Sequence, residues 1–381
     1  MSSEGVAMFL KELSLIIAAG LAVSSPAQTV LPQNPASAPV PSDPLEIVTG
    51  PVQVADTPES RKAALDLLAR ARGNYALRNT TRGYDLKVSF TVTSGGETQY
   101  DGAWQMEEIF VPHEGLRWTA QAAAGYTTTR IAANKHFYAE GTTNTIPLRL
   151  HDARAALFGP IATPRYAGRD LIRTSAATLD GHSVTCVLLS GARNPATPTP
   201  GRRWLESEEC IDPQSGLLLL HSLAPGDYQT YDYANGPSLG NYRLPKKIVE
   251  TEGGKTVMVL QVDSLTGLDT SDPELFKPTE AMTSGEPGVV LGEARKMSFF
   301  ANSSPIPNGA AVDSVCVFGL ITPSGQLVEA HSLQPSDPHS SEAVALAKHV
   351  KLAAPVTVSA RPEQQFGFVI EKFVSPAGGQ P

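Results

Sequence analysis

The three cysteines, Cys186, Cys210 and Cys316, are the residues with the clearest chemistry in this sequence. Cys186 ends a strand-like run, and Cys210 follows a loop rich in proline and glycine over residues 194–201. Two strands joined by such a loop would pair and bring their sulfur atoms within bridging distance. The pattern predicts a Cys186–Cys210 disulfide, of the kind found in exported proteins, and a buried, apolar Cys316.

A metal site is the alternative use of the same two sulfur atoms. Alternate residues of a strand share one face, so His182 could join Cys186 and Cys210 as a third ligand. The sequence shows no clear fourth ligand and no Cys-x-x-Cys spacing. We therefore expect neither a metal nor any other cofactor.

His151 and Asp152, close to Arg154, form the local set that most resembles an acid–base site. They fall at the start of a short helix predicted over residues 148–158. An aspartate at that place also favours the helix by its interaction with the helix dipole. The structural reading of Asp152 is therefore preferred, and the catalytic one stays open.

Adjacent carboxylates occur at Glu107-Glu108 and at Glu208-Glu209. Neighbours on a strand point to opposite faces, so neither pair should form a carboxylate dyad. Serine-hydrolase elbows, metalloprotease motifs and nucleotide-binding glycine loops are missing from the sequence. We expect the protein not to be an enzyme. The alternative is a secreted hydrolase with dispersed histidine and carboxylate residues.

The tyrosines Tyr228, Tyr231 and Tyr233 recur on one predicted strand. They could line a ligand-binding face, or they could simply pack within the sheet. Both readings stay open.

The elements that must position these residues begin with a helix over residues 60–73, with Thr57 or Ser60 as its cap. After this helix, apolar residues recur at every second position. In residues 83–92 the even positions are apolar and most odd positions are polar, as in a half-buried antiparallel strand. Further strands are expected at 100–111, 116–121, 126–132, 136–140, 183–189, 216–223, 227–233, 246–252 and 257–265. The fold class is therefore α+β, a curved antiparallel sheet or incomplete barrel wrapped on a helix.

The helix, the long series of strands, and the segments Leu244-Pro-Lys-Lys-Ile248 and Asp272-Pro-Glu-Leu-Phe276 resemble the LolA-like lipoprotein-carrier superfamily. The resemblance spans residues 57–280. It implies an incomplete β-barrel around a helix, and a cleft for an acyl chain or lipoprotein. It assigns no ligand-binding residue.

A small C-terminal domain is expected over residues 310–374, with the order β-β-α-β. Its turn, Pro323-Ser-Gly-Gln-Leu-Val328, and the alanine-rich helix over residues 340–350 resemble the TonB C-terminal domain family. The aromatic Trp-x-Phe-x-Pro-like segment typical of that family is missing after the helix.

This resemblance implies docking of an envelope protein by strand addition. The candidate edge strand carries Phe366, Phe368 and Ile370, which we expect to share one face toward the helix.

The charge of the chain is acidic, and its prolines are concentrated near the N-terminus. There are 30 Lys and Arg against 38 Asp and Glu, a net charge of −8, and no basic stretch with aromatic residues that would fit nucleic acid. Eight of the 31 prolines fall between residues 26 and 58. We expect a signal peptide at 1–27, a tether at 28–56, a linker at 281–309 and a tail at 375–381. Within the linker, residues 289–291 and 297–300 could add a strand.

Together these features predict a non-enzymatic, periplasmic or outer-membrane-associated protein. It would have no transmembrane span beyond the signal segment. It would hold an apolar group in its larger domain and dock an envelope protein through its smaller one.

Overall fold

The computed structural model describes residues 51–93, 98–143, 145–161, 170–191, 202, 206–268, 272–292, 298–301, 311–352 and 364–375. The predicted signal peptide and nearly all of the tether lie outside these residues. Among the described helices, none combines the length and apolar character needed to cross a membrane.

Helix α2 (Pro58–Tyr75) is stabilised by a reciprocal cap at its N-terminus. Thr57 Oγ1 accepts a hydrogen bond from the Ser60 backbone N–H, and Ser60 Oγ accepts one from the Thr57 N–H. Its buried face carries Ala64, Leu68, Ala71 and Tyr75. The helix extends the predicted 60–73 by two residues at each end, and Thr57 is its cap.

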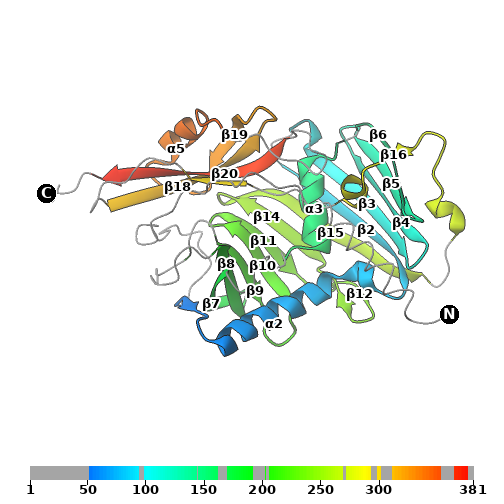
Figure 1. Cartoon of the computed structure of the whole chain (residues 1–381), viewed down its shortest axis with the longest axis horizontal. Helices are drawn as coiled ribbons and strands as arrows, with labels where there is room; N and C mark the ends of the chain where they lie inside the picture. The colour runs from blue at the N-terminus through cyan, green and yellow to red at the C-terminus, as the bar shows by residue number, and fades with distance from the viewer. Residues whose placement is uncertain are drawn as a thin grey trace.

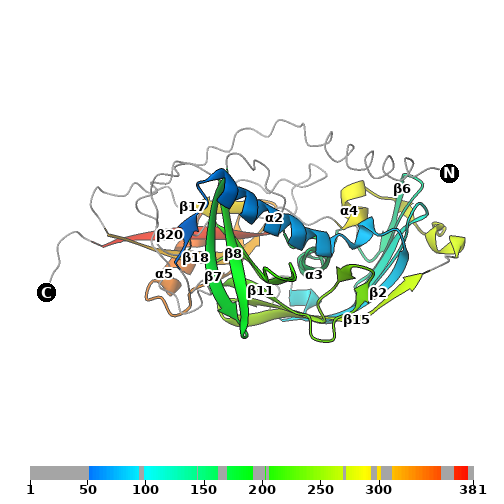
Figure 2. The same ribbon diagram turned by 90° about the horizontal axis from the view of Figure 1, so that it is seen from below.

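Fourteen strands, all paired antiparallel, form one large open sheet (Figures 1 and 2). In chain order they are β1 (Gln53–Val54), β2 (Gly83–Val92), β3 (Gly102–Val111), β4 (Gly115–Ala122), β5 (Thr127–Ala133), β6 (His136–Gly141), β7 (Asp170–Leu179), β8 (His182–Gly191), β9 (Ser207–Ile211), β10 (Leu218–Ala224), β11 (Asp227–Asp232), β14 (Lys247–Glu252), β15 (Lys255–Leu268) and β16 (Thr283–Ser284). Two consecutive series, β7 to β15 and β2 to β6, meet where β15 pairs with β2. The two-residue strands β1 and β16 form the ends, so the sheet is not closed.

The sheet curves, and its concave face packs against α2, α3 (Leu148–Phe158) and α4 (Pro287–Leu291) (Figure 2). A small hairpin of β12 (Ser238–Leu239) and β13 (Tyr242–Arg243) stands beside it. The α+β class and the curved antiparallel sheet wrapped on a helix are thus confirmed. Helix α3 has the bounds that the sequence predicted.

The C-terminal part of the chain forms a second sheet, in the order β17-β20-β18-β19. Its elements are β17 (Ser298–Ala301), β18 (Ala311–Ile321), β19 (Leu327–Ser332), α5 (Ser340–Ala347) and β20 (Gln365–Ser375). We call this part the C-terminal module. The predicted order of strand, strand, helix and strand is present, and β17 adds a fourth strand parallel to β20.

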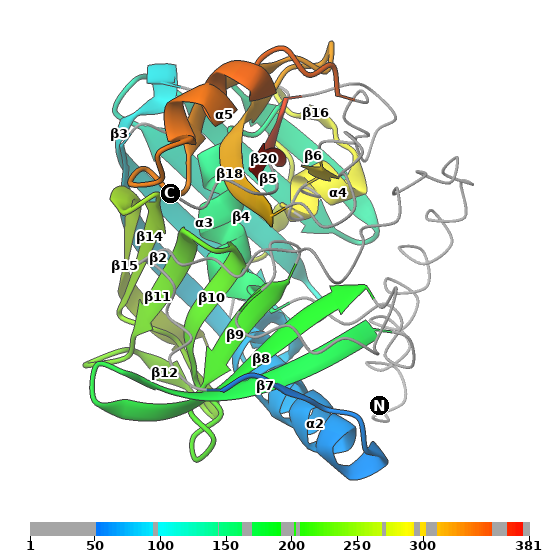
Figure 3. The same cartoon turned by 90° about the vertical axis from the view of Figure 1, so that its left-hand side faces the viewer.

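Both faces of this smaller sheet are buried. Val315, Val317 and Val369 pack under α5. Phe318, Phe366 and Phe368 belong to a second cluster with Leu148 and Ala224 of the larger domain. In Figure 3 the module lies beside the ends of β10, β11 and β14, with α5 on its outer side.

Two expectations about β20 are therefore wrong. Phe366, Phe368 and Ile370 face the larger domain and not α5, because both faces of β20 are apolar and alternation alone cannot distinguish them. The strand is also no free edge from Gly367 to Ile370, because β17 pairs with it there.

Residues 281–309, expected from composition to be a linker, contribute structured elements. Strand β16 pairs with β6, and Val290 of α4 is fully buried in the interior of the larger domain. Helix α4 ends at Gly292, whose φ of 67° lies in the left-handed region that glycine tolerates best.

Candidate functional site

The concave face of the large sheet is lined by buried aromatic and aliphatic side chains. Phe90 and Trp104 stack with ring centroids 5.4 Å apart, and Tyr126 lies 5.5 Å from Trp104. Phe90 and Trp104 lie on this face because alternate residues of β2 and β3 point inward, and Tyr126 comes from the connection between β4 and β5. An apolar face covered by separate helices is the part of the molecule best suited to receive an apolar group.

A cluster of charges interrupts this apolar face. Glu108 on β3 is fully buried. Arg78 donates to it twice, from Nε to Oε1 at 3.0 Å and from Nη2 to Oε2 at 2.7 Å. Arg154 on α3 donates from Nη2 to the same Oε2 at 2.8 Å, and the Tyr84 hydroxyl donates to Oε1 at 2.8 Å. We call Arg78 and Arg154 the arginine pair.

Positive charge exceeds negative charge in this cluster, because two guanidinium groups share one carboxylate. Burial alone would raise the pKa of Glu108, but Arg78 and Arg154 lower it to about 2. Burial lowers the pKa of Arg154 to about 10, an effect that Glu108 opposes and Arg78 reinforces. At neutral pH Glu108 is therefore ionised, both arginines are protonated, and one positive charge is left over.

Helix α4 covers this cluster through its backbone carbonyls. The Leu291 oxygen accepts from Arg78 Nη1 at 3.2 Å and from Arg154 Nη2 at 3.3 Å. The Val290 oxygen accepts from Trp118 Nε1 at 2.6 Å. Arg154 also lies over the Trp118 ring, 4.0 Å from its centroid. A five-residue helix thus closes the charged part of the concave face.

A second cluster lies where the C-terminal module meets the larger domain. Arg149 on α3 donates to Glu250 at 2.8 Å and to Glu252 at 2.5 Å, both on β14. Burial opposes the charged form of Arg149, but Glu252 and Glu250 raise its pKa above the usual value. Asp227 completes this carboxylate cluster. One arginine therefore balances several buried acids.

The C-terminal module contributes two contacts to this cluster. The Phe366 ring centroid lies 4.4 Å from the guanidinium carbon of Arg149, a cation–π contact. His331 Nε2 lies 3.1 Å from Glu252 Oε2. Gly226, in the turn between β10 and β11, lies so close to the module that a Cβ there would be 2.4 Å from the Leu333 oxygen. The two parts are thus tightly packed against each other.

A cavity of about 440 Å³ opens at the same junction. Its lining combines apolar residues, among them Ala330, Pro335 and Val344, with the charged and polar residues Glu252, Lys255, His331, Ser332, Ser340 and Ser341. The cavity is separate from the concave face, where the buried aromatic side chains lie.

Replacing Asp227 by asparagine should stabilise the protein at neutral pH. Burial, reinforced by Glu250 and Glu252, raises the pKa of Asp227 well above its usual value. The folded state therefore holds a proton that the unfolded state releases, and stability falls as pH rises from the ordinary carboxyl pKa to the raised one. We expect a gain of about 1 kcal/mol at pH 7, a rise in Tm of roughly 2–4 °C, that disappears near pH 3.

Thermal unfolding followed by circular dichroism at both pH values measures this difference. The exposed Glu280 serves as a control, since its replacement by glutamine should leave Tm unchanged at both pH values. A loss of stability in Asp227→Asn at pH 7 would contradict the prediction.

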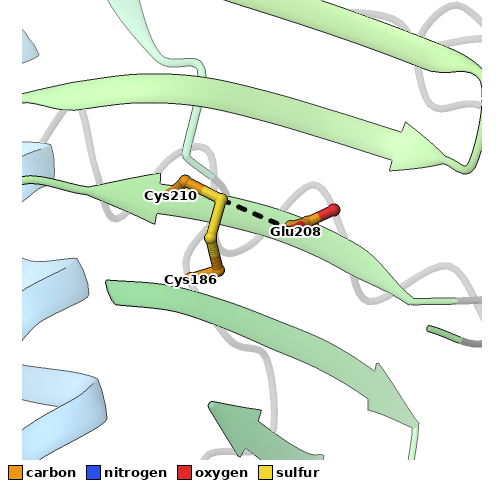
Figure 4. Close-up of side chains that lie close together, drawn as sticks. All are labelled: Cys186, Glu208 and Cys210. Atoms are coloured by element: carbon orange, nitrogen blue, oxygen red, sulfur yellow. Dashed lines mark hydrogen bonds between the residues drawn. A yellow bond between two sulfur atoms is a disulfide. The ribbon is translucent and has the colours of Figure 1, made fainter. Parts of the chain in front are cut away.

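The structure contains the disulfide predicted between Cys186 and Cys210. The two residues are directly paired between β8 and β9, and both are fully buried. Figure 4 shows Glu208 beside them, with Oε1 3.5 Å from Cys210 Sγ. His182 does not belong to this group, and the sulfur atoms are bonded to each other, so the metal alternative is not supported. Cys316 is buried, as predicted.

Removing this disulfide with the double substitution Cys186→Ala and Cys210→Ala should lower the unfolding free energy by about 2–4 kcal/mol, because a cross-link over 24 residues restricts the unfolded chain. Urea unfolding without reductant measures the loss. The buried bond should resist dithiothreitol until the protein unfolds, and equal midpoints for variant and wild type would contradict the prediction.

The structure separates the other predicted sets. On helix α3, Asp152 lies beside Arg149, whereas Arg154 binds Glu108 of β3, so the arginine predicted to lie close to His151 and Asp152 serves a different cluster. Tyr231 and Tyr233 pack in the main core, whereas Tyr228 belongs to a cluster on the opposite face of the sheet. This arrangement favours the packing interpretation of the tyrosines.

Sequence reasoning missed the roles of Arg78, Glu108 and Arg149. One signal was available for Glu108: it shares the inward register of β3 with Trp104 and Met106, so a carboxylate among apolar residues could have been noticed. The arginine contacts depend on how α3 and the short 3-10 turn Leu77–Asn79 after α2 lie over the sheet, which strand alternation does not reveal.

No family model matches the chain, and no curated protein matches it. Solved structures with similar folds include a LolA superfamily protein from Nitrosomonas europaea, with 12% identity and a TM-score of 0.34 over 56% of this chain and 97% of that one. A DUF1329 family protein from Desulfovibrio piger has 8% identity and a TM-score of 0.35 over 57% and 96%. MucB in complex with MucA(peri) has 11% identity and a TM-score of 0.27 over 70% and 82%. Identities and TM-scores of this size add nothing to what the structure itself shows about the fold.

Proposed function

We propose that this protein is a non-enzymatic, exported cell-envelope protein that holds an apolar, acyl-type group on the concave face of its large sheet. The observation that carries the proposal is the construction of that face. It is lined by buried aromatic side chains such as Phe90, Trp104 and Trp118, and it is covered by separate helices in place of a second sheet.

The cover has a part that could give way. Helix α4 has five residues, and its fully buried side chain is Val290. Lifting one short helix exposes the apolar residues beneath it at a smaller cost than separating two sheets, because less apolar area enters water. An acyl chain would replace the contacts that Val290 makes. The LolA-like resemblance of residues 57–280 agrees with a carrier of this kind.

Quenching of tryptophan fluorescence by dibromostearic acid tests this proposal in the full chain. Bromine quenches only on close approach, and Trp104 and Trp118 lie in the concave interior. We expect saturable quenching that is much reduced in the Trp104→Phe, Trp118→Phe double variant. Native mass spectrometry should show one bound acyl chain per protein.

The absence of quenching and of bound lipid would contradict the binding function. Hydrolysis of an acyl ester by the purified protein would contradict the non-enzymatic assignment and favour the secreted hydrolase. The control is the single variant Trp104→Phe, in which Trp118 should still be quenched.

We further propose that the C-terminal module docks an envelope protein by strand addition, as its TonB-like strand order implies. Because β20 lies between β17 and β18, the candidate edge moves to β19, which pairs with β18 as the outer strand of the described sheet. Glu329, with a φ of 50°, interrupts the strand and restricts which segments can pair with it.

A photo-crosslinking amino acid in place of Val328 on β19, tested in an envelope extract, should give a discrete adduct. The same group in place of the exposed Lys62 on α2 serves as the control and should give none. Equal labelling from both positions, or none from Val328, would contradict docking at this edge.

A further inference from the structure

Among the residues that the structure describes, the arginine pair carries one more positive charge than its carboxylate partner Glu108 can balance. Arg154 is 1% exposed, and its Nε has no hydrogen-bond partner among the described residues. Glu108 balances one guanidinium group and not two. An uncompensated buried charge destabilises a fold by several kcal/mol. Groups in such a position are candidates for binding a ligand of opposite charge.

We propose that Arg78 and Arg154 bind the carboxylate of the apolar ligand, and that the Leu291 carbonyl occupies the carboxylate's place while α4 is closed. This inference rests on the proposed acyl-binding function and names its ligand class, a long-chain carboxylic acid with a single negative charge.

The position of Leu291 supports this inference. One carbonyl oxygen lies within 3.3 Å of both guanidinium groups, at 3.2 Å from Arg78 and 3.3 Å from Arg154. A carboxylate oxygen at the same point would keep both hydrogen bonds and add the attraction between opposite charges, which the neutral carbonyl lacks. The guanidinium plane of Arg154 is fixed over the Trp118 ring, so it is already oriented for such a group.

Gly292 leaves room beside Arg154. A Cβ at residue 292 would lie 2.2 Å from Arg154 Nε, so only glycine lets the backbone approach this nitrogen so closely. When α4 lifts, its Leu291 carbonyl and Gly292 leave together, because they are adjacent in the chain. The unpaired Nε then becomes available to the second carboxylate oxygen.

The charge count selects a monoanion. One negative charge neutralises the arginine pair with Glu108, whereas a phosphate monoester with a charge of about −1.5 to −2 would leave an excess. Arg130 on β5 is another buried arginine on the same face, but it donates to Thr128 and Thr143 and makes no described contact with α4. It therefore provides a matched control.

The test compares palmitate with hexadecanol, which has the same chain length and no charge, by isothermal titration of the full chain at pH 7.5. We expect palmitate to bind about 10- to 100-fold more tightly, the range for hydrogen bonds to charged groups. The ratio should fall to about 1 in Arg154→Met and in Arg78→Met, and it should persist in Arg130→Met.

Stability separates a binding role from a structural one. Arg154→Met leaves Arg78 and Glu108 as a balanced pair, so its Tm should equal or exceed that of the wild type. If Arg154→Met does not fold, Arg78→Met provides the same comparison. Equal affinities of the wild type for acid and alcohol, a ratio that persists in both arginine variants, or a ratio lost only in Arg130→Met would overturn the inference. If neither compound binds, the acyl-binding function fails as well.

Discussion

Replacing Arg149 by methionine should destabilise the protein by about 3–5 kcal/mol at neutral pH. Arg149 bridges Glu250 and Glu252 beside the junction with the C-terminal module, and its removal leaves both carboxylates buried without their guanidinium partner. The aliphatic replacement keeps much of the contact with Phe366, so the loss reports mainly on charge. Urea unfolding at pH 7.5 measures this difference.

The pH dependence of this effect has a definite sign. Without Arg149 the two carboxylates hold protons more tightly when folded than when unfolded, so the destabilisation grows as pH rises and shrinks toward pH 4. Adding Glu250→Gln and Glu252→Gln to Arg149→Met should recover about half of the loss at pH 7.5. The control Arg117→Met, on β4, removes a partly exposed arginine and should cost less than about 0.5 kcal/mol. A deficit that is independent of pH would show that packing, and not charge, dominates.

The second large effect is expected for Glu108→Gln. This change leaves both arginines of the pair without a counter-charge in a buried site, and we expect a loss of about 3–5 kcal/mol. The matched control is the adjacent Glu107→Gln on the other face of β3. Glu107 makes a surface pair with Lys87 at 3.2 Å, worth less than about 1 kcal/mol.

A double-mutant cycle isolates the charge interaction in this cluster. Glu108→Gln combined with Arg154→Met should be more stable than Glu108→Gln alone, because the second change removes the unpaired cation. Burial opposes ionisation of Glu108, but Arg78 and Arg154 lower its pKa to about 2. This pKa sets the pH range over which ionised Glu108 stabilises the fold. Its contribution is complete above about pH 4.5 and is lost as pH falls toward 2, so variant and wild type should converge there. Arg154→Met should raise the unfolding free energy more in the Glu108→Gln background than in the wild type, and equal effects in both backgrounds would contradict this account.

The fold was predictable where one face of an element is apolar and the other polar. Strand β2 alternates in this way, and α2 combines an apolar face with a capping residue, so both were predicted closely from sequence. Strand β20 is apolar on both faces, and the side that meets α5 was assigned wrongly. Helix α4 has the proline and glycine content of a linker, and only its tertiary contacts bury Val290.

The candidate sites were less predictable than the fold. The disulfide could be predicted from the sequence because both cysteines lie on strands joined by one loop. The arginine pair could not be predicted in this way. Arg78, Glu108 and Arg154 come from three different elements, and their contacts depend on how α3 crosses the sheet. Charged residues in a sequence are usually solvated, and their burial becomes visible only once the helices are placed.

The pairing of β15 with β2 has a consequence for how the chain folds. Each series of consecutive strands can form from local hairpins, but the two join through residues about 170 positions apart. Closing so long a loop is slow, because its entropy is lost before the new contacts form. A chain that emerges N-terminus first must therefore leave the β2 edge of this series of strands unpaired until β15, which ends at residue 268, is available. During that interval the nascent protein would depend on a chaperone that binds extended apolar strands.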